Sequence, residues 1–258
     1  MLHNLLGDYR DWLLQSSSRE TADSYRHRLA ALLAGQSVSD TVNRLDIEKI
    51  LDKLGGIKYK NHFSQSKNAF LHFCAFQGIK LSADTHTRIK EMSDKSIKKH
   101  RKLKEVEYSE IEDKIKRLRN MKLKLSYQTI IATGLRVSEL AGLSANNCNI
   151  SDDSIIFNFV GKGAKTGTVM IDKADCPKLF ERLKDMIEST SADKKVFYSI
   201  GYLQRQATEL GFACHDLRRA FAKLEYPKCR NKAELSEKMR HSNIRTTNIY
   251  LKSKVKVK

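Results

Sequence analysis

The sequence contains very little proline and no paired cysteine motif. Only two prolines, Pro177 and Pro227, occur in 258 residues, so most of the chain can form helices without the breaks that proline causes. The five cysteines lie far apart, and no C-x-x-C pair is present. An odd, scattered set argues against a disulfide framework and against a zinc site. We therefore expect reduced, structural cysteines and no bound metal.

Long apolar runs and a secretory leader are also missing. No stretch approaches the ~20 apolar residues that cross a bilayer, and no basic amphipathic segment carries an aromatic membrane anchor. The N-terminus "MLHNLLGDYRDW" has neither a basic region nor a cleavage site. These absences predict no membrane partner and a cytoplasmic location, nucleoid-associated if the partner is DNA.

Acidic residues are scarce relative to basic ones. The chain has 48 Lys and Arg against 30 Asp and Glu, which gives a net charge of +18. A charge of this size usually indicates a polyanionic partner, and nucleic acid is the first choice. At this point a generic RNA- or ribosome-binding protein remains an alternative to a DNA-binding one.

Helical periodicity dominates the first 82 residues. Four stretches repeat apolar residues at helical spacing: residues 2–14, 17–35, 43–56 and 59–78. Their connections are short, so they predict a small helical bundle. This region is only mildly basic, with 11 basic and 8 acidic residues among the first 80.

The composition then changes to a basic stretch. From Arg88 to Lys104 there are eight Lys and Arg but only two acidic residues, and "KSIKKHRKLK" within this stretch has no apolar period. We expect a basic linker over residues 83–104. It could be merely solvated, or it could cross a phosphate backbone. In the second case the DNA-binding candidates are Lys95, Lys98, Lys99, Arg101, Lys102 and Lys104.

Residues 105–258 combine helical segments with one β-rich pair. Two helices are expected in 108–134, a short one in 136–143 and five more after residue 178. Between them, "SIIFNFVGKGAKTGTVMID" has two β-rich runs around a Gly/Lys/Thr turn, which predicts a hairpin. The expected fold class is mainly α with a small antiparallel β-sheet (α+β).

Two basic motifs could bind an anion. In "HDLRR", Arg218 follows His215 by three residues, so a helix presents both on one face, where they could hold an oxyanion such as phosphate. In "TGLRVSEL", Arg136 begins a short helix, and Glu139 can fix it through a charge-assisted hydrogen bond. Ordinary surface charges would give the same two patterns.

Two further residues are candidates for proton transfer and nucleophilic attack. Lys162 lies between two glycines in "GKGAKTG", where an exposed ammonium could reach a groove, although a solubilising turn lysine would look the same. Tyr250 ends "HSNIRTTNIY", nine residues after His241. A phenol ionises near pH ~10, so a nucleophilic tyrosine needs nearby cations or a base. A core aromatic in a last helix is the alternative.

The order of these motifs carries more information than any one of them. "ATGLRVSELAGL", "GKGAK" between two strands, "HDLRRAFA" and "HSNIRTTNIY" follow one another, and together they closely resemble the tyrosine recombinase (phage integrase) family. "SRETADSYRHRLAALL" resembles the opening of that family's core-binding domain. The resemblance implies a helical DNA-binding domain over 1–82, the linker over 83–104 and a catalytic domain over 105–258. This layout resembles the simple two-domain type of Xer- and Cre-like recombinases.

The resemblance also implies an activity and roles for single residues. It implies a site-specific DNA recombinase or integrase that forms a 3′-phosphotyrosyl intermediate and exchanges strands between paired sites through a Holliday junction. The implied roles are phosphate binding for Arg136, Arg218 and His241, general acid for Lys162, proton transfer or phosphate orientation for His215, support for Glu139 and nucleophilic attack for Tyr250. Arg219 and Arg245 are further candidates for DNA binding.

The implied partners are double-stranded DNA with specific sites and further copies of the chain, expected as a tetramer on DNA. No cofactor is expected, because the covalent link conserves the phosphodiester energy and no carboxylate cluster suits two metals. Arg240 departs from the family, which usually has glycine before this histidine. The connection from Lys162 to His215 also looks short. Only "LKSKVKVK" follows Tyr250, and its alternating end could form a strand.

Two alternatives share parts of this interpretation. A type IB DNA topoisomerase uses the same active-site chemistry without paired sites, and the short tail suits a monomer. A non-catalytic DNA-binding protein could keep the fold, but the complete set of six candidate catalytic residues argues against it.

Overall fold

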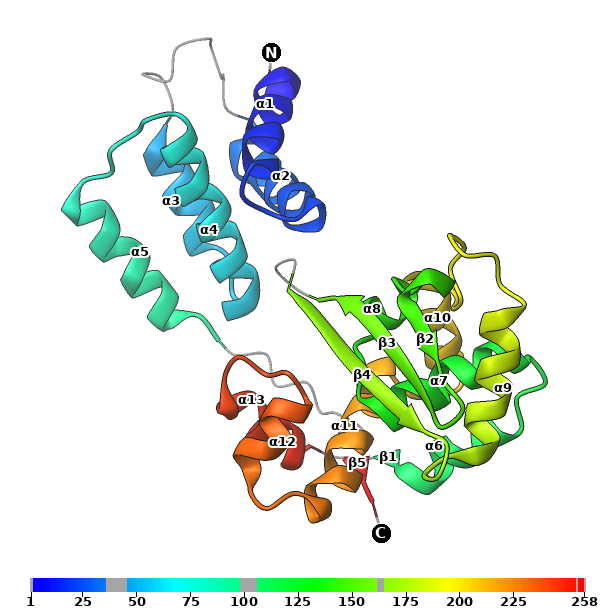
Figure 1. Cartoon of the computed structure of the whole chain (residues 1–258). Helices are drawn as coiled ribbons and strands as arrows, with labels where there is room; N and C mark the ends of the chain where they lie inside the picture. Colours follow the sequence, from blue (N-terminus) through cyan, green and yellow to red (C-terminus); the bar gives the residue numbers. More distant parts are fainter. Residues whose placement is uncertain (1, 36–45, 98–105, 162–164, 254, 258) are drawn as a thin grey trace. The chain divides into compact units, whose positions relative to one another are not determined.

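The computed structural model describes all residues except 1, 36–45, 98–105, 162–164, 254 and 258. Contacts within the chain divide it into two units, residues 1–102 and 103–258 (Figure 1). Within the described ranges, no helix has both the length and the apolar character needed to span a bilayer.

The first unit is a set of helices around a shared apolar core. Its helices are α1 (Leu2–Leu14), α2 (Arg19–Leu33), α3 (Ile47–Gly55), α4 (Lys60–Phe76) and α5 (Ala83–Lys95). Tyr9 packs edge to face on Phe73, with ring centroids 5.6 Å apart, and its hydroxyl donates to the Ala69 carbonyl over 2.8 Å. Helix α2 contacts α1, α3 and α4. The predicted bundle is confirmed, but it has one helix more than the sequence indicates.

This additional helix, α5, corrects the expected linker. The charge count places residues 83–95 in the linker, yet they form α5. Ser82 caps the helix by accepting a hydrogen bond from the Thr85 backbone N–H over 3.1 Å, and Ile89 is buried in the core. The helix has three Lys and Arg and three Asp and Glu residues, so a charge count that begins at Arg88 could not distinguish it from a solvated linker.

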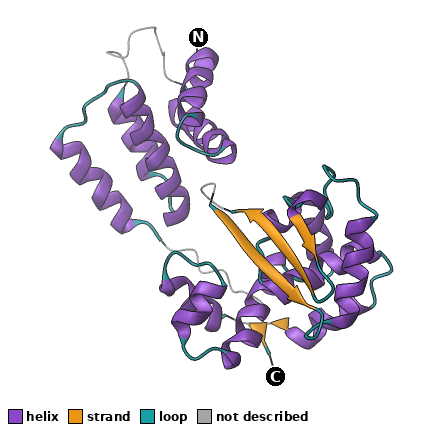
Figure 2. Cartoon of the chain, in the orientation of Figure 1, coloured by secondary structure: helices purple, strands orange, loops and turns teal. Residues whose placement is uncertain are grey.

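The second unit arranges helices around a three-stranded antiparallel sheet (Figure 2). The strands are β2 (Cys148–Ile150), β3 (Ser154–Val160) and β4 (Thr166–Asp172). The helices are α6 (Tyr108–Lys116), α7 (Met121–Thr133), α8 (Val137–Ala141), α9 (Pro177–Glu188), α10 (Ile200–Glu209), α11 (Cys214–Glu225), α12 (Lys232–Lys238) and α13 (Ile244–Leu251), with 3-10 turns η2 (Ala145–Asn147) and η3 (Tyr226–Lys228). The predicted hairpin is β3–β4. Strand β2 has no sequence signal because it is only three residues long.

The core of this unit has two parts. On β3, every second residue is buried, namely Ile155, Phe157 and Phe159, and helices α8 and α9 contact that strand. A smaller apolar cluster joins α11, α12 and α13, and it contains Phe221, Leu235, Met239 and Tyr250. The last helix, α13, therefore packs against this smaller apolar cluster.

A short strand at the end of the chain pairs within the same chain. Strand β5 (Val255–Lys256) lies parallel to β1 (Val106–Glu107), and Val255 is buried. The Lys223 ammonium on α11 donates to the Ser253 carbonyl over 2.7 Å and also to the Val255 carbonyl. The strand-type tail considered from the sequence is thus present, and it follows α13 directly.

Candidate active site

A glycine in the left-handed backbone conformation shapes the turn that positions Arg136. Gly134 ends α7 with φ of 63°, a conformation that favours glycine. A Cβ there would lie only 2.4 Å from the Phe221 ring, so glycine also lets α11 pack closely against the turn. Arg136 then stands at the N-cap of α8.

The spacing of Arg136 and Glu139 produces the predicted ion pair. Glu139 is buried, and its Oε1 accepts a hydrogen bond from Arg136 Nη1 over 2.6 Å. Its Oε2 accepts from the Arg136 backbone N–H over 2.8 Å. The Arg136 side chain is 34% exposed. Its guanidinium is therefore fixed from behind and still open to a ligand.

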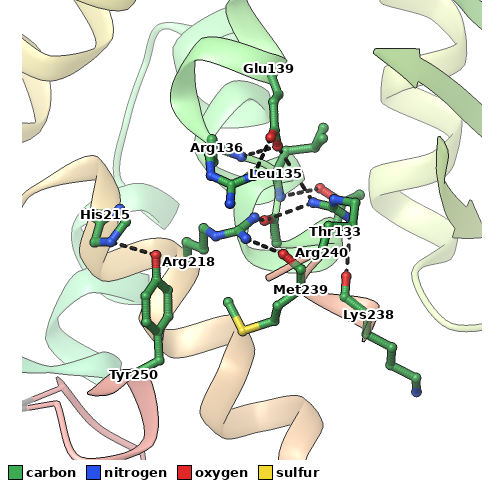
Figure 3. A network of polar contacts seen from close by, with 11 residues as sticks. Thr133, Leu135, Arg136, Glu139, His215, Arg218, Lys238, Met239, Arg240 and Tyr250 are labelled. Carbon is green, nitrogen blue, oxygen red and sulfur yellow. Dashed lines mark hydrogen bonds and ion pairs between the residues drawn. The ribbon is translucent and has the colours of Figure 1, made fainter. Parts of the chain in front are cut away.

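Arg218 is the most deeply buried cation of the described chain. It is 1% exposed, and its two terminal nitrogens donate to the carbonyls of Gly134 and Met239 (Figure 3). Burial and the Arg136 charge lower the pKa of its guanidinium. Its buried Nε has no hydrogen-bond partner among the described residues. A buried donor of this kind is costly unless a ligand satisfies it.

Tyr250 lies beside both candidate histidines. Its ring is 5% exposed, and its hydroxyl lies 2.6 Å from His215 Nε2 (Figure 3). The ring packs edge to face on His215 and on His241, with centroids 5.0 Å and 4.8 Å apart. The Arg218 guanidinium carbon lies 6.0 Å from the tyrosine ring centroid. The candidate nucleophile therefore lies next to a proton acceptor and a fixed cation.

The surroundings keep both imidazoles neutral near pH 7. Burial lowers the pKa of His215 to about 4, and the charges of Arg219 and Arg218 add to this effect. By its accessible surface His215 is an exposed residue, so solvent weakens the burial effect, and the direction of the shift rests also on the neighbouring arginine charges. Burial, followed by the charges of Arg218 and Arg136, likewise lowers the pKa of His241 to about 4. A neutral His215 can accept the Tyr250 proton at Nε2.

A threonine that sequence reasoning missed orients His241. His241 Nδ1 lies 2.9 Å from the fully buried Thr247 hydroxyl. If the hydroxyl donates to Nδ1, the proton of the neutral ring is on Nε2. That Nε2 is buried and has no hydrogen-bond partner among the described residues. Thr247 lies three residues before Tyr250. This i,i+3 spacing on a helix is the one feature of the sequence that could have placed Thr247 near the site.

These groups together can bind a tetrahedral oxyanion beside a phenol. Two guanidiniums and one neutral imidazole donor converge near Tyr250, and two of these residues have buried nitrogens without partners. A cavity of about 480 Å³ borders Arg136, His215 and Arg218. No group of three or more His, Cys, Asp or Glu side chains within the described ranges is arranged to hold a metal. Cofactor-free chemistry remains a prediction.

Of the other predicted residues, those within the described ranges do not join this cluster. Lys162 lies outside the described residues, as do Lys98, Lys99, Arg101, Lys102 and Lys104. Lys95 is exposed near the end of α5, and Arg245 is exposed on α13. Arg219 lies on α11 and pairs with Asp216 over 2.7 Å. Lys165, the other lysine of the hairpin turn, is exposed and accepts a backbone hydrogen bond from Gly161.

Comparison with known proteins gives consistent results. The model described as "Phage integrase family" matches residues 101–256. Tyrosine recombinase XerH of Campylobacter jejuni is 29% identical over an aligned length of 144, and the match covers 49% of this chain and 40% of that protein. The match therefore spans less than half of that relative's length.

Solved structures of recombinases have a similar fold. A lambda integrase dimer bound to a core site aligns with 99% of this chain and 98% of its own, with a TM-score of 0.67 and 16% identity. XerH bound to its difH substrate aligns with 93% and 77%, with a TM-score of 0.60 and 17% identity. At these identities the likeness establishes the fold alone.

Proposed function

The chain belongs to the phage integrase family, and from this premise we propose that it is a site-specific DNA recombinase. It would cleave and rejoin DNA strands through a covalent link between Tyr250 and a 3′ phosphate. One observation carries the proposal: the Tyr250 hydroxyl lies 2.6 Å from the neutral His215 Nε2, beside the buried Arg218. The arrangement supplies a nucleophile, a proton acceptor and a fixed cation.

The phosphate would be held by donors that are already in place. Arg136, Arg218 and His241 Nε2 would donate to its non-bridging oxygens. Their orientations are fixed by Glu139, by two backbone carbonyls and by Thr247. Negative charge grows on these oxygens in the transition state, so fixed donors stabilise that state more than the ground state. Removing one such donor typically slows the reaction by about 10²–10³-fold.

The proton and bond changes balance without an external reactant. The Tyr250 oxygen forms a bond to phosphorus while its proton passes to His215 Nε2. The bond from phosphorus to the 5′ oxygen breaks, and we assign Lys162 as the group that protonates this leaving oxygen. Gly161, the residue before Lys162 in the chain, lies close to the Glu139 carboxylate: a Cβ there would be 3.3 Å from Oε1. Rejoining is the reverse reaction with a 5′ hydroxyl.

Exchange between paired sites is the finer part of the proposal. Strand exchange would pass through a Holliday junction in a tetramer of the chain on double-stranded DNA, in the cytoplasm at the nucleoid. The net charge of +18 predicts binding that weakens steeply with salt, because phosphate contacts release counterions. Lys95, Lys98, Lys99, Arg101, Lys102, Lys104, Arg219 and Arg245 are the proposed DNA contacts. A flat salt dependence would contradict this assignment.

One observation favours a type IB topoisomerase as the second candidate. The tail after Tyr250 pairs with β1 of its own chain, so a single chain can hold its nucleophile without a neighbour. A plasmid assay separates the two functions. A topoisomerase relaxes any supercoiled plasmid at low enzyme concentration, whereas a recombinase joins two defined sites.

Covalent capture tests the shared chemistry. The full chain is incubated with labelled duplex fragments of its source genome, denatured and separated, and the trapped DNA is sequenced. We expect an adduct that survives denaturation at Tyr250, with fragments that share a common sequence. Tyr250→Phe keeps the ring and its packing, so it should bind DNA but form no adduct. A persistent adduct in this variant would show that another residue is the nucleophile.

The choice of Lys162 over Lys165 has its own test. Lys162→Ala should slow cleavage severely, and a substrate with a 5′-bridging sulfur should restore it, because a thiolate leaves without protonation. Lys165→Ala is the matched control on the same turn. Rescue of the Lys165 variant instead would reverse the assignment.

A further inference from the structure

Arg240 has a backbone conformation that side chains usually avoid. Its φ is 54°, and it is the one non-glycine residue of the described chain with positive φ. This region costs conformational free energy for residues other than glycine, and it persists where the surrounding structure enforces it. The Arg240 side chain makes contacts here that glycine could not supply.

The Arg240 guanidinium contacts the same two groups that hold the candidate phosphate-binding arginines. Its Nη2 lies 3.6 Å from Glu139 Oε2, the carboxylate that fixes Arg136. The same nitrogen donates over 3.2 Å to the Gly134 carbonyl, which also accepts from Arg218 (Figure 3). One residue thus joins the supports of both arginines.

The remaining contacts fix the plane of this guanidinium. Its Nη1 donates to the Lys238 carbonyl over 3.2 Å, and its central carbon lies 4.9 Å from the centroid of the Phe159 ring. A Cβ on Gly167 would lie 2.6 Å from Phe159 Cζ, so glycine on β4 leaves space for that ring. The planar fork and its stacking are properties of arginine that lysine lacks.

We propose that Arg240 is a positioning residue that couples the Glu139–Arg136 pair to the Gly134–Arg218 pair. It acts through Glu139 and the Gly134 carbonyl. Its loss should leave DNA affinity nearly unchanged and should slow cleavage, because the two arginines would sample orientations that do not match the transition state. Its effect on cleavage rests on the proposed function.

Arg240→Gly is the decisive variant because glycine suits a positive φ. The variant should fold, because the strain relieved at a positive φ offsets part of the loss of the Arg240 contacts. We expect its rate of adduct formation on captured DNA to fall by about 10- to 100-fold, as for partners that orient a site's ligands, with DNA affinity within about twofold. Arg230→Gly, in an exposed loop of the same unit, controls for the loss of one positive charge.

Two comparisons separate positioning from other roles. If Arg240 acts through Glu139, the losses caused by Arg240→Gly and Glu139→Gln should combine to less than the product of the separate losses. Arg240→Lys, which keeps the charge without the planar fork, should restore less than half of the rate. An unchanged rate in Arg240→Gly, independent losses in the double variant, or full rescue by lysine would each overturn the proposal.

A measurement without DNA keeps this test independent of the proposed function. In arginine-labelled protein, NMR can follow rotation about the Nε–Cζ bond of Arg136. Arg240→Gly should accelerate this rotation, and Arg230→Gly should not. Equal rotation in both variants would refute the coupling. Absence of an adduct in the unaltered protein would instead refute the proposed chemistry and leave the rotation result valid.

Discussion

Replacing Thr247 by valine tests how His241 is held. The change keeps the shape of the side chain but removes the hydroxyl that lies 2.9 Å from His241 Nδ1. Thr247 is fully buried, so water cannot readily replace the lost partner. A buried polar atom left without a partner costs about 1–3 kcal/mol. With a loss of about 2 kcal/mol, a unit of this size should melt roughly 4–8 °C lower.

The effect on cleavage should exceed the effect on stability. Without the hydroxyl, the His241 proton can move to Nδ1, and Nε2 then no longer donates to the phosphate. We expect cleavage to slow by roughly 10- to 100-fold at temperatures where the protein remains folded. The assay is the rate of covalent adduct formation on captured DNA in single-turnover conditions.

Two variants on the same helix serve as controls. Thr247→Ser keeps the hydroxyl and should cleave within a fewfold of the unaltered rate. Thr246→Val makes the same chemical change one residue earlier, away from His241, and should cleave normally. If Thr247→Val cleaves as fast as Thr246→Val, the histidine does not need this hydrogen bond and the reasoning fails.

The remaining predictions concern the pH dependence of stability and whether Tyr250 attacks DNA in the active site of its own chain. Because His215 and His241 have folded-state pKa values near 4, below the ordinary 6.5, the unfolded state binds more protons between these limits. The free energy of unfolding should therefore decrease as pH falls from about 6.5 to about 4. In chemical denaturation at several pH values, His241→Gln should make this decrease smaller. An unchanged pH dependence in the variant would contradict the pKa shift of His241. Since Tyr250 contacts His215 within one chain, mixing Tyr250→Phe with Arg218→Ala protein should not restore adduct formation, and recovery would mean that the tyrosine attacks in a neighbouring site.

The sequence predicted those parts of the fold that have local signals. Helical periodicity located most helices, and the two β-rich runs around "GKGAKTG" located the β3–β4 hairpin. The Arg136–Glu139 contact followed from i,i+3 spacing. Helix α5 was missed because Ile89 and Met92 are its only large apolar residues and because the basic stretch counted from Arg88 to Lys104 begins inside it. The β1–β5 pair joins residues far apart in sequence, and no local pattern indicates such a contact.

The candidate site was predictable as a set of residues but not as a network. Motif order gave the candidate residues without indicating what orients each one. The supports came from packing: the Gly134 carbonyl, which bonds to both Arg218 and Arg240, and the Thr247 hydroxyl at His241. Every residue has a backbone carbonyl, so the sequence does not indicate which carbonyl will bind an arginine. A threonine in a helix has many ordinary roles, so its presence does not indicate a contact with His241.

The position of the Tyr250 hydroxyl depends on supports on both sides of it in the chain. Before Tyr250, the Thr247–His241 contact ties α13 to the turn that follows α12. After it, β5 pairs with β1 and is held by Lys223. Because Lys223 and His215 both belong to α11, the helix that supplies the proton acceptor also holds the tail behind the nucleophile.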